Sequence, residues 1–430
     1  MRFTLALVLY RLLFLILTPL LLLVLLLRSL SHQAYRQRLP ERLGMLAKNF
    51  QPNGIIVHAA SVGEVIALQP FISQLLSNYP QVPITVTTFT PTGSAQVQKL
   101  FADKVQHCYL PLDNIFSTAL FLKCLKPKAM IFMETELWPN LITQCASYDI
   151  KLMLVNGRLS DKSMRSYKKI AWLITPTIRC FDKILTQSQV NQDNYLAMGA
   201  NTARCVLSGN LKFDISLNHD VATKQQALST LLVDKRKIWL IASTHPGDEI
   251  LILKAFEQVK QQDSNALLVI VPRHPERFEQ VVKLAADAGN QVLRRSQEQP
   301  VTLNTNVWVI DTLGELLAAC ALANVVTMGG SFSDIGGHNP LEPALFQKPV
   351  IVGPNMSNFK EILAQLTSAK GIVQLNENKA MAQALAQEVI RLLVDETSAQ
   401  TLGQNSYKVV QANQGATAQS LTALQTLLKS

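Results

Sequence analysis

The sequence predicts an α/β protein made of two doubly wound domains, each a parallel β-sheet covered by helices on both faces. Short apolar stretches typical of buried parallel strands alternate with helical stretches along most of the 430 residues. The pattern runs through the chain twice, with a division near residue 210. We therefore expect a separate N-terminal segment at residues 1–28, one domain at residues 29–210 and a second at residues 211–430. Ligands in such sheets bind at the carboxyl ends of the strands.

The N-terminal segment is typical of a membrane anchor. Between Phe3 and Leu27 the chain is apolar at all but a few positions, and about 20 such residues are enough to cross a bilayer. By the positive-inside rule the rest of the chain is cytoplasmic, because the segment is followed by Arg28, Arg36, Arg38, Arg42 and Lys48. A cleaved signal peptide fits less well, since the apolar stretch is too long and no cleavage site of small residues follows it. Arg11 and Pro19 leave open whether the helix crosses the bilayer or lies partly in the interface.

The net charge of +10 is concentrated in two segments. Residues 1–50 hold seven basic residues and one acidic residue, and residues 151–183 hold eight basic and two acidic residues. This excess favours a surface that faces something anionic. A membrane explains it better than nucleic acid does, because no recognition helix or aromatic-rich basic sheet accompanies it. The six cysteines have neither metal-site nor redox spacing, so we expect reduced, mostly buried thiols.

The expected strands follow one another through both halves. In the first half they are residues 54–59, 83–88, 105–110, 129–133, 152–155, 183–186 and 205–208. In the second half they are residues 238–242, 266–271, 291–293, 307–310, 324–328 and 350–352. A helix is expected over Glu64–Asn78. Residues 163–181 mix apolar and basic side chains, and we favour an amphipathic helix pair packed on the sheet over a membrane-surface or acyl-chain contact.

The loop after the first strand carries a candidate general base. His58-Ala59-Ala60-Ser61-Val62-Gly63-Glu64 ends a strand, turns near a glycine and places the Glu64 carboxylate at a helix start. The helix dipole alone could favour a carboxylate there. The carboxylate could equally take a proton from an acceptor hydroxyl at the mouth of a cleft, and the residues leave both readings open. Ser61 and Gly63 are candidate substrate contacts in the same loop.

Two further positions in or near the first half could carry charge into the site. Met133–Asn140 also follows a strand, and its two acids cannot share a helix face, so we choose Glu134, which is nearer the strand end. Glu136 is then a candidate cap for the following helix. Lys212 lies near the domain division and is either a solvated surface charge or a cation beside a negatively charged donor.

In the second half, a glycine loop runs from Gly329 to Ala344 between a strand and a helix start. Asn339 is a good N-cap, Pro340 suits the first helical position, and Glu342 lies three residues after the cap. Such a loop can bind an anion through unpaired N–H groups, and we expect a phosphate. The alternative is a tight turn before a well-capped helix with no ligand. Candidate substrate contacts in this loop are Gly336, Gly337 and His338.

Two other loops of the second half add candidates. Pro272-Arg273 follows a strand, and arginine can hold a phosphate or carboxylate through two hydrogen bonds, although an exposed loop arginine is also common. Leu313-Gly314-Glu315 supplies another loop and helix start. No cluster has the spacing of zinc ligands and no acid pair demands magnesium, so no metal or other cofactor is expected.

These motifs, in this order, closely resemble the 3-deoxy-D-manno-octulosonic acid (Kdo) transferases of Gram-negative bacteria. The resemblance spans nearly the whole chain and is carried by His58–Val65, Pro83–Ser94, Met133–Asn140, Leu211–Ile215, Val271–Phe278 and Gly336–Glu342. It implies the GT-B glycosyltransferase fold, in which two Rossmann-like domains face each other across the active-site cleft. It also implies transfer of Kdo from CMP-Kdo to the lipid A precursor (lipid IV-A), with inversion, at the cytoplasmic face of the inner membrane.

Position by position, the resemblance makes Glu64 the residue that activates the acceptor hydroxyl. It matches Glu134 and Lys212 to an acid and a lysine that stabilise the transition state. Contacts with CMP are implied for Pro272, Arg273, Leu313, Gly314, Glu315, Asn339, Pro340, Leu341 and Glu342. Leu313 is the least regular match, so we expect only its backbone to contribute. CMP-Kdo is the donor substrate, and no metal is expected because a helix start and Arg273 can stabilise the leaving phosphate.

Other functions remain open on the sequence alone. One is a membrane-associated GT-B glycosyltransferase that uses a UDP-sugar. A nucleotide-sugar epimerase of the same fold is less favoured because it has no need of a membrane helix. A third is a non-catalytic, membrane-anchored nucleotide-binding protein. Thermal protection by CMP or UDP distinguishes the nucleotides, and Glu64→Gln distinguishes an enzyme from a binding protein.

Overall fold

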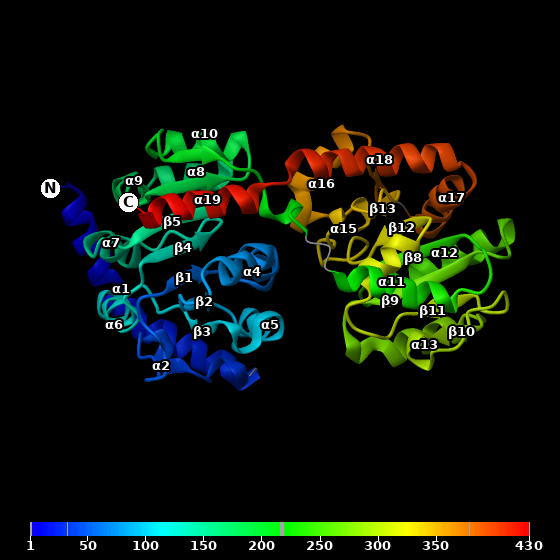
Figure 1. Ribbon diagram of the computed structural model, residues 1–430, viewed down its shortest axis with the longest axis horizontal. Helices are drawn as coiled ribbons and strands as arrows, with labels where there is room; N and C mark the ends of the chain where they lie inside the picture. The colour runs from blue at the N-terminus through cyan, green and yellow to red at the C-terminus, as the bar shows by residue number, and fades with distance from the viewer. Residues whose placement is uncertain (1, 32, 216–218, 378, 430) are drawn as a thin grey trace. The chain divides into compact units, whose positions relative to one another are not determined.

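The computed structural model describes residues 2–31, 33–215, 219–377 and 379–429, and the chain forms two compact units (Figure 1). Unit 1 consists of Met1–Asp214 together with Asn413–Ser430, and unit 2 consists of Ile215–Ala412. Each unit contains a seven-stranded sheet whose neighbouring strands are parallel. The predicted strands are confirmed, each within two residues at either end.

The strand order of the unit 1 sheet is β3-β2-β1-β4-β5-β6-β7. Its strands are β1 (Ile55–His58), β2 (Ile84–Thr88), β3 (Gln106–Tyr109), β4 (Ala129–Met133), β5 (Lys151–Gly157), β6 (Lys183–Thr186) and β7 (Cys205–Leu207). Ile55 in β1 pairs with Ile84 in β2 on one side and with Ala129 in β4 on the other. The direction of the chain through the sheet therefore reverses between β1 and β4, and ligands of doubly wound proteins bind at such a point.

Helices cover both faces of this sheet. They are α1 (Arg2–Ser31), α2 (Leu39–Arg42), α3 (Val62–Ala67), α4 (Gln69–Asn78), α5 (Pro91–Phe101), α6 (Ile115–Leu125), α7 (Pro139–Ser147), α8 (Asp161–Lys168), α9 (Ala171–Arg179), α10 (Gln189–Ala197) and α19 (Ala416–Lys429), with the 3₁₀ turns η1 (Gln33–Tyr35), η2 (Ala102–Lys104) and η3 (Leu211–Phe213). The single helix predicted over Glu64–Asn78 is wrong. The chain breaks at Leu68 and starts a new helix, because Pro70 lacks an N–H group and fits only the first turn of a helix.

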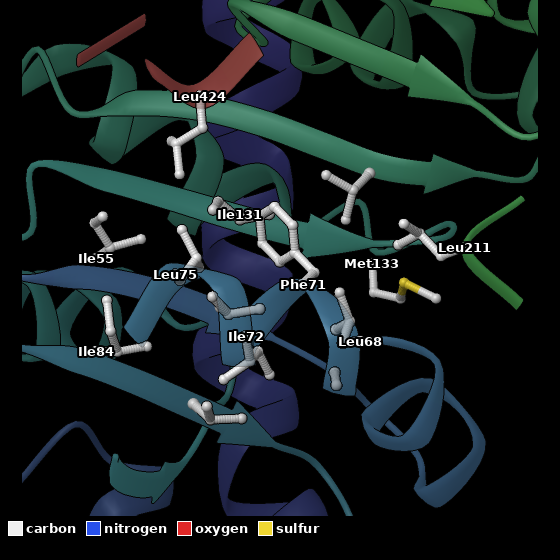
Figure 2. Packing of buried hydrophobic residues seen from close by; sticks show 14 of the residues in the cluster. Ile55, Leu68, Phe71, Ile72, Leu75, Ile84, Ile131, Met133, Leu211 and Leu424 are labelled. Atoms are coloured by element: carbon white, nitrogen blue, oxygen red, sulfur yellow. The ribbon is translucent and has the colours of Figure 1, made fainter. Parts of the chain in front are cut away.

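Apolar side chains fill the space between α4 and the sheet (Figure 2). Phe71 and Leu75 lie one turn apart on α4 and belong to the same buried cluster as Ile55 of β1 and Ile131 of β4. The opposite face of the sheet is covered by α6, α7, α9 and α10, whose buried side chains include Phe121, Ile142, Ile174 and Tyr195. Residues 163–181 thus form mainly the amphipathic helices that we favoured, packed on the sheet.

The C-terminal helix α19 belongs to unit 1, so the predicted assignment of residues 413–430 to the second domain is wrong. It packs beside α4 and β5 in that unit (Figure 1). Leu421 and Leu424 are buried in the same cluster as Phe71, and Figure 2 shows Leu424 with Phe71. The N-terminus of the helix is also fixed to unit 1, because Asp214 accepts hydrogen bonds from the backbone N–H groups of Gly415 and Thr417.

The strand order of the unit 2 sheet is β10-β11-β9-β8-β12-β13-β14. Its strands are β8 (Ile238–Thr244), β9 (Leu267–Pro272), β10 (Val292–Arg294), β11 (Val307–Val309), β12 (Val325–Met328), β13 (Val350–Val352) and β14 (Val373–Gln374), the last of which was not predicted. Here the chain reverses between β8 and β12, where Ile241 pairs with Thr327.

The helices of unit 2 are α11 (His219–Leu231), α12 (Asp248–Gln262), α13 (Phe278–Asp287), α14 (Leu316–Leu322), α15 (Leu341–Ala344), α16 (Lys360–Ser368), α17 (Met381–Val394) and α18 (Glu396–Asn413), with the 3₁₀ turns η4 (Pro275–Arg277), η5 (Arg295–Gln297) and η6 (Ser357–Phe359). The core is one cluster between the sheet and the pair α12 and α17, and it contains Trp239, Phe256 and Val389. Behind the strand ends, Glu249 and Arg277 form a buried pair with two hydrogen bonds of 2.6 and 3.1 Å.

Candidate active site

In unit 1, Glu64 lies in the first turn of α3, directly after the carboxyl end of β1. One oxygen of its carboxylate accepts the Ser61 hydroxyl at 2.8 Å, and the other accepts the backbone N–H of Ala60 at 2.9 Å. The Ser61 side chain in turn accepts the backbone N–H of Glu64, so Ser61 is the N-cap of α3. A carboxylate has about four acceptor positions, and two hydrogen bonds leave room for a substrate hydroxyl.

The electrostatic environment of Glu64 suits a general base. Burial raises the pKa of its carboxyl, and the nearby Glu134 and Glu136 carboxylates raise it further. The hydrogen bonds from Ala60 and Ser61 act in the opposite direction but do not cancel the rise. A carboxylate with a raised pKa is a stronger base than an exposed one.

The structure brings Glu134 and Lys212 together. Glu134 follows β4 directly, and Lys212 lies in the turn η3 after β7, yet the Lys212 Nζ is 3.7 Å from the Glu134 carboxylate. The backbone of Glu134 is left-handed, with φ of 58°, a conformation that costs free energy for a residue with a side chain. Its backbone is held there by hydrogen bonds with the Val155 carbonyl and the Tyr195 hydroxyl.

A buried pair beside this site was not predicted. The fully buried His58 at the end of β1 has its Nε2 3.5 Å from the Glu136 carboxylate and its Nδ1 2.9 Å from the Thr87 hydroxyl. Glu136 also accepts the Trp138 indole N–H at 2.8 Å, so it does not cap the following helix. Burial raises the pKa of Glu136, but the contacts with His58 and Trp138 outweigh burial and leave the pKa lowered. In the sequence, only the histidine at the end of the first strand indicated that such a pair could form.

Gly63 occupies an exposed position in the first turn of α3. A side chain built there would have no heavy atom within 4 Å, and the backbone does not have a positive φ. Packing and backbone geometry therefore do not require glycine at this position. An open surface next to the Glu64 carboxylate leaves space for a substrate, in line with the predicted role of Gly63 as a contact.

In unit 2, the loop from Gly329 to His338 follows β12 at the reversal point of the sheet. The Gly330 N–H donates to the buried Asp248 carboxylate at 2.7 Å, and Gly337 N–H closes the loop onto the Gly330 carbonyl at 2.9 Å. Positive φ and close neighbours explain the glycines, since a Cβ on Gly336 would lie 2.4 Å from the Ser357 hydroxyl. The glycines are thus needed to form this loop, whether or not it binds a phosphate.

The expected helix start after the loop is only partly confirmed. The Asn339 side chain accepts the Leu341 N–H at 3.2 Å, but the helix begins at Leu341 and not at Pro340. It ends after four residues, at Ala344. So short a helix has a weak dipole, so an anion bound in this loop would depend more on neighbouring side chains.

Side chains from three loops lie together after the strand ends of unit 2. His245 follows β8, His274 follows β9, and His338 closes the glycine loop. The Nε2 atoms of His245 and His338 are 2.8 Å apart with stacked rings, and the His274 ring meets His245 edge-on at 5.2 Å. The exposed Arg273 lies close enough that its charge lowers the pKa of both His338 and Glu342. Burial is the larger effect for both, lowering the pKa of His338 to about 3 and raising that of Glu342 to about 7.

The third segment for which contacts with CMP are implied is the loop Leu313–Glu315. Leu313 is exposed and Gly314 has a left-handed φ of 79°. Glu315 is buried and its carboxylate accepts Arg295 at 3.2 Å as well as the Thr312 hydroxyl. Its side chain already has partners, so a ligand would meet this loop through Leu313, Gly314 or backbone groups.

The two units carry different chemistry at their strand ends. Unit 1 presents carboxylates and one lysine, which suits proton removal and charge stabilisation. Unit 2 presents an exposed arginine and three imidazoles, which suits an anionic ligand. Within the described residues no group of three or more His, Cys, Asp or Glu is arranged to hold a metal ion.

Comparisons with known proteins identify the family. A profile described as 3-deoxy-D-manno-octulosonic-acid transferase (kdotransferase) matches residues 37–215. A 3-deoxy-D-manno-octulosonic acid transferase of Haemophilus influenzae is 40% identical over 422 residues, which is 98% of this chain and 98% of that protein. The chain belongs to the Kdo transferase family. Another member, from Rickettsia prowazekii, is 32% identical over 375 residues, 86% of this chain and 78% of that protein.

Membership makes this Kdo transferase a glycosyltransferase, and solved structures confirm its GT-B fold. A glycosyltransferase from Rickettsia africae matches with a TM-score of 0.55 at 13% identity, covering 88% of this chain and 99% of that chain. A UDP-GlcNAc 2-epimerase from Neisseria meningitidis matches with a TM-score of 0.56 at 15% identity, covering 88% of this chain and 100% of that chain. At these identities the likeness concerns the fold and not the reaction.

The N-terminal helix of the Kdo transferase fits a membrane anchor by length and composition. The apolar stretch Leu5–Leu30 spans 26 residues with a mean hydropathy of 2.5.

All six cysteines are free thiols, and four of them are buried.

Proposed function

We propose that this Kdo transferase moves Kdo from CMP-Kdo to the lipid A precursor (lipid IV-A), with inversion at the anomeric carbon and with Glu64 as general base. The observation that carries the proposal is the Glu64 carboxylate, held at the reversal point of the unit 1 sheet with a raised pKa beside the open surface at Gly63. Family membership supports the sugar that is transferred.

In the proposed reaction Glu64 accepts the proton of the acceptor hydroxyl. The freed oxygen forms a bond to the anomeric carbon of Kdo, while the bond from that carbon to the CMP phosphate oxygen breaks. The electron pair of the broken bond stays on the phosphate, so CMP leaves with one more negative charge. Attack and departure occur on opposite faces, which accounts for inversion.

Lys212 and Glu134 are proposed to stabilise the transition state together. Kdo carries its own carboxylate, and the Lys212 ammonium would pair with that group or with the phosphate. The Glu134 carboxylate 3.7 Å away fixes the direction of the lysine and would favour the positive charge that develops at the anomeric carbon.

The leaving CMP is proposed to bind at the strand ends of unit 2. Arg273 would hold the phosphate through two hydrogen bonds, with His338 and the loop N–H groups nearby. The buried Glu342, whose pKa is raised to about 7, could accept a hydrogen bond from the nucleoside without adding a full charge beside the phosphate. We expect turnover without a divalent metal, and addition of EDTA tests this directly.

Membrane association completes the proposal. The apolar helix α1 and the basic residues around it support binding to a cytoplasmic, anionic membrane surface, which for this family would be the inner membrane. A phosphorylated, acylated acceptor would be presented by the same surface.

The decisive experiment follows the lipid product by mass, using the full chain in membranes, CMP-Kdo made in situ and a tetra-acylated lipid A precursor. Glu64→Gln keeps a side-chain carbonyl that can still accept the Ala60 N–H, so the fold should persist while the base is lost. We expect its turnover to fall by about 10²–10⁴-fold. Glu257→Gln, on the exposed face of α12, is the matched control and should have wild-type activity.

Each result has a separate meaning. A product heavier by one or more Kdo units supports the reaction and counts the additions. Turnover of Glu64→Gln within tenfold of wild type would contradict the role of the base. If the folded wild type gave no product, and UDP rather than CMP raised its melting temperature, the donor would be a UDP-sugar instead.

A further inference from the structure

Helix α1 packs along unit 1 instead of standing away from it. It lies beside α6, α7 and α9 (Figure 1). The Tyr10 hydroxyl donates to the Asp113 carboxylate at 2.7 Å, and the Arg11 Nε donates to the Asn140 side chain at 3.3 Å. Asp113 also accepts the N–H of Asn140 at the start of α7, so the tyrosine joins a network that already belongs to the folded unit.

The contact continues in both directions along the helix. Towards the N-terminus, Ala6 and Leu7 are buried against Leu173 of α9. Towards the C-terminus, Thr18 is buried and its hydroxyl accepts the Asn114 amide at 3.1 Å. The docked part of α1 therefore extends from residue 6 to residue 18.

The residues that follow α1 are also held on unit 1, through Arg38 and Arg42. The Arg38 guanidinium donates to the His107 carbonyl at 2.8 Å. Arg42 is buried, donates to the Phe89 carbonyl at 2.7 Å and lies 4.0 Å from the centre of the Tyr109 ring. The first half of α1 and the residues that follow the helix thus both contact the rest of unit 1.

This geometry is incompatible with α1 crossing a bilayer. If residues 6–18 lie on unit 1, only residues 19–31 remain to cross, and at 1.5 Å per residue they reach roughly 20 Å. The hydrocarbon core is about 30 Å thick. If residues 6–18 crossed instead, Asp113 and Asn140 would have to enter the hydrocarbon with them, which is costly for a carboxylate.

The side of α1 that faces away from unit 1 is apolar and exposed. The exposed fractions reach 62% at Leu5 and 68% at Ile16, and similar values hold at Leu9, Leu12, Leu13, Leu20, Leu23 and Leu27. The neighbouring helices also expose large apolar side chains, Phe116 on α6 at 70% and Trp172 on α9 at 49%. So large an apolar surface requires an apolar partner.

Basic residues next to this surface identify the partner as an anionic bilayer. Lys168 and Lys169 are exposed directly before Ile170 and the helix α9, which carries Trp172, and Arg36 is exposed just after α1. Aromatic and basic side chains together are typical of the headgroup region. An amphipathic helix that lies alone on a membrane needs one polar face for the water, whereas α1 is apolar on all sides. Helix α1 does not need a polar face of its own, because the rest of unit 1 covers the side that would otherwise meet water.

We propose that α1 lies along unit 1 in the plane of the membrane, as a monotopic anchor whose two ends are on the same side of the bilayer. The inference rests on the membrane association in the proposed function but not on the sugar, donor or catalytic residues. It places α1, α6 and α9 at the bilayer surface, so that an acceptor could reach unit 1 by lateral diffusion.

The first test is the location of the N-terminus. The full chain carries one epitope tag before Met1 and, in a second version, one after Ser430. We expect protease to remove both tags in inside-out inner-membrane vesicles and neither in intact spheroplasts. Removal of only the N-terminal tag in spheroplasts would show that α1 crosses the bilayer and would overturn the proposal.

The second test is a disulfide between α1 and α6 in membranes. Thr18→Cys with Asn114→Cys should cross-link on mild oxidation and change mobility on a denaturing gel. Leu20→Cys with Asn114→Cys is the matched control, because Leu20 is 54% exposed on α1, and should not cross-link. The single variants account for the native thiols, of which Cys124 and Cys180 are partly exposed.

The outcomes separate the two proposals. A cytoplasmic N-terminus with the Thr18 cross-link supports the monotopic anchor. A cytoplasmic N-terminus without the cross-link would overturn docking on unit 1. Kdo transfer is measured in the same vesicles, so a failed transfer reaction and a failed topology are seen independently.

Discussion

The hydrogen bond from Ser61 to Glu64 should set the acid side of the pH–activity profile. A general base must be ionised, so activity falls as the pH drops through the pKa of Glu64. The Ser61 hydroxyl donates to the ionised carboxylate at 2.8 Å and lowers this pKa, against the rise caused by burial. Ser61→Ala removes the bond, so the pKa should rise and the acid limb of kcat/KM should move to higher pH.

The size of the shift follows from the strength of the bond. A hydrogen bond to a charged group contributes about 1.5–3 kcal/mol, and we halve this because water can reach the half-buried Glu64 in the variant. At about 1.4 kcal/mol per pKa unit, the acid limb should move up by roughly 0.5–1 pH unit. Ser61→Thr keeps a hydroxyl at the same place and should leave the limb within about 0.2 unit of wild type.

The same change should alter stability in a pH-dependent way. The folded-state pKa of Glu64 is raised, so the folded protein holds this proton more tightly and loses stability as the pH rises through the pKa. Below the unfolded-state pKa, Ser61→Ala should cost only the lost N-cap, about 1 kcal/mol. Near neutral pH the lost bond to the carboxylate should add to this cost. Urea unfolding across the pH range measures both parts.

A limb that stays in place, or that moves to lower pH, would refute this reasoning. A limb that stays in place would mean that another group controls the acid side, and Glu64 would then lose its support as the base even if Glu64→Gln were inactive. A limb that moves to lower pH would mean that the serine bonds mainly to the protonated carboxyl, which contradicts the predicted direction of the shift.

Three further changes test other parts of the structure. Lys212→Met should lower kcat by about 10²–10³-fold in steady-state assays while the melting-temperature shift caused by CMP stays unchanged. Arg273→Lys keeps the charge but loses the planar pair of donors, so calorimetry should show CMP binding weakened about tenfold, with loss of less than threefold counting against the role. Leu424→Ala should destabilise unit 1 by about 2–5 kcal/mol in urea unfolding, although α19 lies at the far end of the chain; an unchanged midpoint would contradict its place in the core.

The strands and the loops after them could be predicted from the sequence because each depends on local pattern. A short apolar run such as Ala129–Met133 has few alternatives to a buried strand, and the polar residues that follow must emerge at one edge of a parallel sheet. That reasoning was enough to find Glu64, Glu134 and Arg273. Their pairing with particular partners, such as Glu134 with Lys212, depends on residues almost eighty positions apart.

Features that depend on distant packing could not be predicted. The membership of α19 in unit 1 is decided by where Leu421 and Leu424 are buried, and nothing within α19 itself specifies that partner. His58 and Glu136 come close because β1 and β4 are neighbouring strands that end at the same edge of the sheet. The short α15 was overestimated because Asn339 and Pro340 are good local signals for a helix start, and such signals do not specify how far the helix continues beyond its first turn.

Two of the non-glycine residues with a left-handed backbone lie at the reversal points of the sheets. Glu134 after β4 and Ser243 at the end of β8 are non-glycine residues with φ near 60°, a conformation that costs about 1 kcal/mol or more. In unit 2 the strain allows close packing, because the Ser243 carbonyl would lie 2.4 Å from a Cβ on Gly329. In unit 1 the Glu134 backbone is held in this conformation by the Val155 carbonyl and the Tyr195 hydroxyl. A glycine would adopt the conformation more easily, but only a side chain can make the contact with Lys212, which links this position to the proposed chemistry.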